Sequence, residues 1–102
     1  MTRDELMIEV DKQFGRCKRT LMKKNEAYAG QDNVFFNFEQ AASLQLEGVQ
    51  DAIMGMMVKH EVQLHKMVNG IEEVTTKQLN ETIGDILNYL FLLRAYYSTL
   101  EL

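Results

Sequence analysis

The sequence predicts an all-α fold in a single domain, and three observations support this prediction. The 102 residues contain no proline, so no helix is interrupted by a residue that lacks a backbone N–H donor. Apolar side chains recur every three or four residues in long segments, which is the periodicity of an amphipathic helix. Residues typical of helix caps and helix ends flank these segments. We therefore expect residues 1–102 to form a four-helix bundle with one short helix.

The composition is that of an average soluble globular protein, with 46% hydrophobic and 25% charged residues. No run of about 18 apolar residues is free of charge, so we expect no membrane span and no membrane partner. The N-terminal segment carries acids where a signal peptide needs a basic flank. The one cysteine, Cys17, cannot form an internal disulfide, which fits a reducing cytoplasm. We expect a cytoplasmic protein and an inert core thiol.

The charge is unevenly distributed along the chain. Residues 1–30 hold seven Lys or Arg against five Asp or Glu, whereas the rest of the chain is acidic and the net charge is −4. The basic excess comes from Arg16, Lys18, Arg19, Lys23 and Lys24. Such a helix face can bind phosphates or nucleic acid, or it can simply be solvated and paired with acids. Because the chain is acidic overall, we do not expect nucleic acid as the partner.

The first helix is expected to begin at a capping box formed by Thr2 and Glu5. Its apolar seam consists of Met7, Val10, Phe14, Cys17 and Leu21. The same spacing continues to Lys24 and Tyr28, where a cation and a phenol replace apolar side chains. Either this end of the seam lines a pocket, or Lys24 extends its amine to water and Tyr28 covers the core with its hydroxyl outward.

A turn over residues 29–33 is expected to lead into the short second helix, with Asp32 or Asn33 as N-cap. Its phenylalanines are expected mostly in the core, and one of them can stack on a base or cover a pocket. The third helix is predicted over residues 49–69, between Gly48 and Gly70.

On the third helix, His60 occupies a gap in a stripe formed by Ile53, Met57, Leu64 and Val68. A histidine in such a place is either a hydrogen-bonded core residue or a ligand contact. His65 lies five residues further along, so the two do not form a zinc pair at i, i+4 spacing.

The fourth helix is expected to start after a cap at Thr75 and Thr76, with Gln78 three residues past Thr75. Its seam consists of Leu79, Ile83, Ile86, Leu90, Leu93 and Tyr97. Leu92, Tyr96 and Leu100 lie off this seam, so a further helix is needed to cover them. Because short bundles often complete their core by association, we expect a homo-oligomer.

Polar residues interrupt the fourth helix where it is most apolar. Glu81, Asp85 and Asn88 share one face at i, i+4 and i+7, and Gly84 beside them permits close approach of a helix or a ligand. Glu81 and Asp85 together can hold one Mg²⁺, which usually binds one or two carboxylates plus ligand phosphates. The alternative is a structural Asp85 paired with a Lys or an Arg. The other helices offer few carboxylates, among them Glu61.

Two blocks of the sequence resemble a phage and bacterial family described as a nucleotide-modification-associated domain, placed near the MazG-like all-α NTP pyrophosphohydrolases. The family pattern falls on Lys24, Tyr28, Gly30, Phe35 or Phe36, Asn37, Phe38, Asp85 and Tyr89. Ala29 separates Tyr28 from Gly30, a departure of one residue. The MazG-like acidic signature is incomplete, because Thr82 lies three residues before Asp85 and residues 49–69 contain no Glu-Glu-x-x-Glu run.

The resemblance implies a MazG-like bundle with a nucleotide-binding cavity between helices, in host cytoplasm if a phage encodes the chain. Phosphates would contact Lys24 and Lys66, and the remaining expected ligand contacts are Tyr28, Phe36, Asn37, His60, Asn88 and Tyr89. A hydrolase would release pyrophosphate with Mg²⁺ on Asp85 and Glu81, with Glu61 as a further catalytic candidate. Two alternatives stay open: a protein that binds and sequesters a nucleotide without chemistry, and a helical protein-interaction module.

Overall fold

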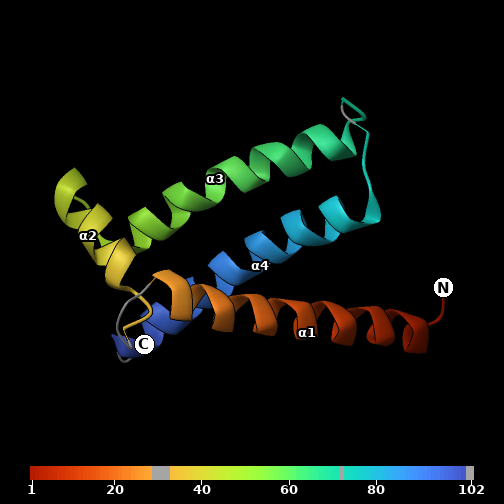
Figure 1. Ribbon diagram of the computed structural model, residues 1–102, viewed down its shortest axis with the longest axis horizontal. Coiled ribbons are helices and arrows are strands. Elements are labelled where there is room, and N and C mark those ends of the chain that lie inside the picture. Colours follow the sequence, from red (N-terminus) through yellow and green to blue (C-terminus); the bar gives the residue numbers. More distant parts are fainter. Residues whose placement is uncertain (29–32, 72, 101–102) are drawn as a thin grey trace.

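The computed structural model describes residues 1–28, 33–71 and 73–100, except the side chains of residues 24–28. This part of the chain forms four α-helices and no strand, which confirms the all-α prediction. The helices are α1 (Arg3–Tyr28), α2 (Phe36–Gln45), α3 (Val49–Val68) and α4 (Thr76–Thr99) (Figure 1). None of the described helices is long and apolar enough to cross a bilayer.

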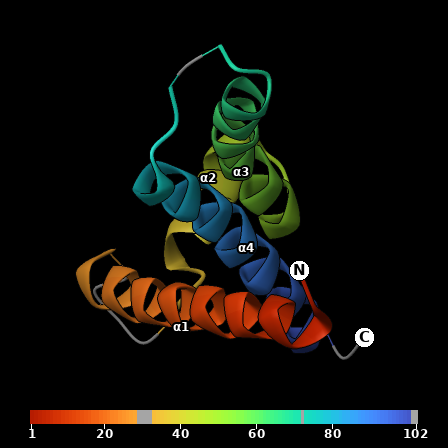
Figure 2. The same ribbon diagram turned by 90° about the vertical axis from the view of Figure 1, so that its right-hand side faces the viewer.

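Helix α4 lies between α1 and α3. Helix α3 packs along α4 on one side and against the short α2 at its own N-terminal end, and α1 packs against α4. The two views show that α1 crosses α4 while α3 and α4 run side by side (Figures 1 and 2). This arrangement leaves much of the outer surface of α1 without a neighbouring helix.

Local capping signals set the beginnings of three helices as predicted. The Thr2 hydroxyl accepts from the Glu5 N–H at 3.1 Å, and the Glu5 carboxylate accepts from the Thr2 N–H at 3.3 Å. Thr75 and Gln78 form the same reciprocal pair before α4. Gly48 precedes α3, and Gly70 follows it at φ +69°, where glycine carries no steric penalty. These capping hydrogen bonds and helix-end glycines involve residues only a few positions apart, so the sequence alone predicts them.

The predicted N-cap of the second helix is wrong. Helix α2 begins at Phe36, and Phe35 occupies the N-cap position. The Asn33 side chain instead accepts a hydrogen bond from the Phe35 N–H at 3.0 Å, two residues along the chain. Asn33 therefore closes a turn before the helix, a common alternative use of this side chain. Asp32 lies outside the described residues.

The hydrophobic core lies at the α2 end of the molecule. Phe38 and Ala42 of α2 meet Ala52 and Ile53 of α3, and Ile53 is completely buried. Side chains of α4, among them Tyr89, Leu92, Leu93 and Tyr96, pack against this cluster. The chain's own α2 and α3 thus provide the cover that Leu92 and Tyr96 require, whereas Leu100 remains exposed.

The seam predicted for the first helix does not form a core stripe. Only Cys17 is buried, whereas Met7 and Phe14 each keep more than half of their surface exposed. The face of α1 that meets α4 is the one with Gln13 and Cys17, which both contact the α4 backbone. A spacing pattern indicates that a helix has an apolar side, but the crossing of α1 over α4 decides which part of that side is covered.

The buried positions of α4 also differ from the predicted seam. Thr82, Gly84 and Asn88 are buried, whereas Leu90 of the seam is exposed. Helix α4 contacts helices on two sides, so it buries more than one stripe. At Gly84 a Cβ atom would lie 3.1 Å from the Gln13 Nε2 atom, so glycine permits the close approach of α1.

Candidate functional site

A cavity of about 790 Å³ lies between α1 and the first half of α4. Its volume falls within the range of small-molecule sites in proteins. The lining comes from two stretches of chain: Gln13, Arg16, Cys17, Arg19, Thr20 and Lys23 on α1, and Thr76, Lys77, Asn80, Glu81, Gly84 and Asp85 on α4. Because the two helices cross, they diverge from their contact at Gly84 and leave this space between them.

The cavity is rich in cations. Three come from α1, namely Arg16, Arg19 and Lys23, and Lys77 faces them from α4. Two carboxylates of α4, Glu81 and Asp85, also line the space. Four positive and two negative side chains leave an excess of positive charge, which attracts an anionic ligand.

Arg16 has an incomplete set of hydrogen bonds in the cavity wall. Its Nη2 atom donates to the Gln13 Oε1 atom at 2.7 Å. The Gln13 Nε2 atom in turn lies 3.5 Å from the Asn80 carbonyl oxygen of α4. The Arg16 Nε atom is buried and has no hydrogen-bond partner in the described part of the chain. Since buried donors are nearly always satisfied in folded proteins, this donor is a candidate contact for a ligand.

Asp85 belongs both to the cavity wall and to the contact between α3 and α4. Its Oδ2 atom lies 3.4 Å from the His60 Nδ1 atom, and both side chains are largely buried. The His60 ring is stacked at a tilt against Tyr89, with centroids 5.3 Å apart. Tyr89 meets the edge of Phe38 in the core. The carboxylate within the most apolar segment is therefore held by a histidine that is itself packed on the core.

Asn88 lies one helical turn beyond Gly84 and is 5% exposed. Within the described residues, neither its Nδ2 nor its Oδ1 atom has a hydrogen-bond partner. A buried amide without partners destabilises a fold by about 1–3 kcal/mol for each unsatisfied group. Such a residue needs an explanation in ligand binding, in bound water or in a second conformation.

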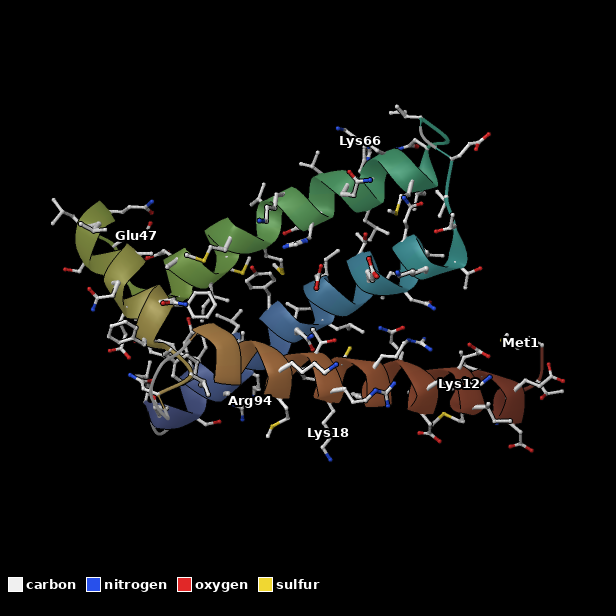
Figure 3. All side chains as sticks on the ribbon, viewed as in Figure 1. Met1, Lys12, Lys18, Glu47, Lys66 and Arg94 are labelled. Carbon is white, nitrogen blue, oxygen red and sulfur yellow. The ribbon has the colours of Figure 1, made fainter. Side chains whose placement is uncertain are left out.

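The structure brings together some of the sequence-predicted site residues and separates others. Glu81 and Asp85 line the cavity, and His60 and Tyr89 lie behind Asp85. The other predicted contacts with described side chains do not line the cavity: Glu61 and Lys66 on α3, Phe36 and Asn37 on α2, and Asn88 on α4. Lys66 projects from the far end of α3 (Figure 3). The side chains of Lys24 and Tyr28 lie outside the described residues.

Sequence reasoning singled out the basic segment but missed most of the cavity wall. Gln13, Arg16, Thr20 and Lys23 follow one another at steps of three, four and three, so they form a polar stripe beside the apolar seam. That periodicity was the signal that would have placed Arg16 and Lys23 on one face. Lys77 had no comparable signal, because only the crossing of α1 and α4 brings it to the cavity.

The carboxylates fit a divalent ion only in part. Glu81 and Asp85 lie at i, i+4 spacing on the cavity wall, which suits a Mg²⁺ that brings ligand phosphates and water as its other ligands. No cluster of three or more His, Cys, Asp or Glu able to hold a metal occurs among residues 1–28, 33–71 and 73–100. Asp51 caps α3 and Glu39 accepts from Asn33, so these carboxylates act locally.

No protein-family model, curated protein or solved structure matches this chain. The resemblance to nucleotide-modification-associated domains and MazG-like enzymes stays a prediction from short motifs.

Proposed function

We propose that this protein binds a phosphate-bearing small molecule, a nucleotide in the first instance, in the cavity between α1 and α4. One observation carries the proposal: four cations converge from two helices on a space of ligand size. In this proposal Arg16, Arg19 and Lys77 contact the phosphates. Arginine suits this role because its planar guanidinium donates two parallel hydrogen bonds to phosphate oxygens.

The polar wall supports recognition of the rest of the ligand. Gln13, Thr20 and Asn80 offer side-chain donors and acceptors next to the cations. The cavity lining carries no aromatic side chain among the described residues, so base stacking there is not part of the proposal. The motif resemblance, which implies a nucleotide, favours the same class of ligand.

A Mg²⁺-dependent pyrophosphohydrolase is the second candidate, and the placement of Glu81 and Asp85 across the cavity from the cations of α1 favours it. A Mg²⁺ ion carried on ligand phosphates would neutralise charge and activate water. In that case Glu81 and Asp85 would hold the ion while Arg16 and Lys77 orient the phosphates. Without such chemistry the same cavity sequesters the nucleotide.

The test is calorimetric titration of the full chain with mono-, di- and triphosphates of the common nucleosides, with and without Mg²⁺, followed by a pyrophosphate assay. Binding that strengthens with phosphate number supports the proposal. Pyrophosphate release that disappears in Asp85→Ala and Glu81→Gln identifies the hydrolase, and intact ligand identifies the binder. If no nucleotide, triphosphate included, binds at millimolar concentration, the proposal is wrong.

A further inference from the structure

The outer surface of α1 carries a regular strip of largely exposed residues, of which Phe14 also touches Phe91 of α4. We name this the outer strip: Asp4, Met7, Asp11, Phe14, Lys18 and Met22, at steps of three, four, three, four and four. Residues at these steps share one face of a helix. This face lies about a quarter turn from the Cys17 side that contacts α4. Lys18 extends from α1 away from the other helices (Figure 3).

The apolar members of the outer strip each keep more than half of their surface exposed. Met7, Phe14 and Met22 are 54%, 52% and 61% exposed. Phe14 is fixed on one side by Phe91 of α4, with ring centroids 5.7 Å apart, and its remaining surface faces solvent. Three large apolar side chains on one helix face, with Asp11 and Lys18 between them, are typical of an interface with another protein.

The order of residues along the strip is self-complementary. Consider a second α1 that runs antiparallel to the first, with a two-fold axis between Phe14 and Gly15. Each residue then faces the partner residue for which the two residue numbers add up to 29. Asp11 then faces the partner's Lys18, and Lys18 faces the partner's Asp11. Met7 meets the partner's Met22 under the same rule. An interface of this kind must match itself in this way, because both copies present the same patch.

Gly15 fits the same arrangement. Glycine in a helix interior is unfavourable relative to alanine, so a packing reason is expected. Within the chain a Cβ atom at Gly15 would lie 3.4 Å from the Arg19 Nη1 atom, at the end of a flexible side chain. Close packing inside the described chain therefore does not require glycine here. Across the proposed axis, Gly15 faces the partner's Phe14, and the missing side chain makes room for the ring.

The charges along α1 favour the antiparallel orientation. Residues 3–12 contain four acids and two bases, whereas residues 13–23 contain four bases and no acid. An antiparallel pair places the acidic half of each helix beside the basic half of the other, and a parallel pair would place like charges together.

We propose that the outer strip is the interface of a two-fold homodimer, formed by antiparallel α1 helices with the axis between Phe14 and Gly15. The cavity lies on another face of α1, which carries Arg16, Thr20 and Lys23, so both copies keep their cavities open. This proposal is independent of the nucleotide, and its test uses the full chain without ligand.

Sedimentation velocity measures the assembly directly. The wild-type chain is expected at twice its mass of 11.8 kDa. Asp11→Lys and Lys18→Asp each create two like-charge contacts per dimer, so each is expected to weaken dimerisation at least about tenfold. The double variant Asp11→Lys/Lys18→Asp restores opposite charges and is expected to restore the dimer. Glu47→Lys and Lys59→Asp, exposed and outside the strip, are the matched controls and should dimerise like the wild type.

Cysteine cross-linking tests the orientation. A mixture of Met7→Cys and Met22→Cys chains is expected to form a disulfide-linked dimer, because positions 7 and 22 face each other. Neither variant alone is expected to form a disulfide-linked dimer, because the two copies of the same position would lie about 22 Å apart along the antiparallel helices. Cross-linking of Met7→Cys with itself, a monomer at hundreds of micromolar, or a dimer unaffected by either charge reversal would each overturn the proposal.

Discussion

The Oδ2 atom of Asp85 lies 3.4 Å from the Nδ1 atom of His60, which joins the cavity wall on α4 to a residue of α3. His60 is in turn packed on Tyr89. Asp85 lines the cavity, whereas His60, which contacts its carboxylate, is not one of the cavity-lining residues. His60 is therefore a positioning residue for Asp85 in the proposed site.

Replacing His60 is expected to weaken ligand binding without removing any cavity residue. His60→Leu deletes the contact with Asp85, and we expect about a two- to tenfold loss of nucleotide affinity, the effect of losing about 0.5–1.5 kcal/mol from one polar contact. His60→Gln keeps a side-chain donor and is expected to recover part of the affinity. Calorimetric titration of both variants with one nucleoside triphosphate provides the measurement. Equal affinities for wild type and His60→Leu would show that Asp85 is held by other contacts.

Asn88→Leu is expected to stabilise the fold. The buried Asn88 amide has no hydrogen-bond partner among the described residues, and leucine of similar size removes this desolvated group. We expect the free energy of unfolding to rise by about 1 kcal/mol, measured by urea denaturation. A loss of stability of that size would indicate that a bound water or a second conformation satisfies Asn88. If nucleotide affinity falls while stability rises, Asn88 serves the ligand rather than the fold.

The helix caps and the position of His60 show how much of this structure follows from sequence. The capping boxes at Thr2 and Thr75 involve residues three apart, so local spacing predicts them. The position of His60 within the apolar stripe of the third helix predicted that its side chain points to the interior, and the structure confirms this. Its partner Asp85 was not predictable, because the relative placement of α3 and α4 depends on packing across 24 residues of intervening chain.

The covered faces of α1 and α4 were the least predictable features. The seam pattern treats every apolar position alike, and so it could not distinguish buried Cys17 from exposed Met7. On α4 the pattern placed Leu90 on the apolar seam and Asn88 on a polar face beside it. In the structure Asn88 is buried, whereas Leu90 is exposed. The cavity lies where these two helices diverge, so its α4 residue Lys77 could be found only from the three-dimensional structure.

Gly84 and Gly55 provide a matched pair that tests the approach of α1 to α4. A side chain at Gly84 would meet Gln13 and Cys17, whereas a Cβ atom at Gly55 has nothing within 4 Å. We expect Gly84→Leu to reduce the free energy of unfolding by about 1–3 kcal/mol, because it forces the helices apart. Gly55→Leu is expected to raise stability by about 0.5–1 kcal/mol through helix propensity. Thermal and urea denaturation of both variants measure the difference, and equal effects would contradict the close contact.

The cations of the cavity are expected to determine both the affinity for phosphates and its salt dependence. Arg16→Gln removes the guanidinium whose Nε atom is buried without a partner among the described residues, and Lys77→Gln removes the opposing cation of α4. Each change is expected to weaken triphosphate binding about tenfold or more, since hydrogen bonds to charged groups contribute about 1.5–3 kcal/mol. Affinity should also fall less steeply with added salt than in the wild type, because fewer charges contact the ligand.

Lys59→Gln is the control for both cavity variants, since Lys59 is exposed on α3 and does not line the cavity. It removes one positive charge from the whole chain without touching the proposed site. Titrations at low and at physiological ionic strength separate the two effects. If Lys59→Gln loses as much affinity as Arg16→Gln, binding follows net charge alone, and the cavity between α1 and α4 is not the phosphate site. If only the cavity variants lose affinity, the phosphates bind where the two helices diverge.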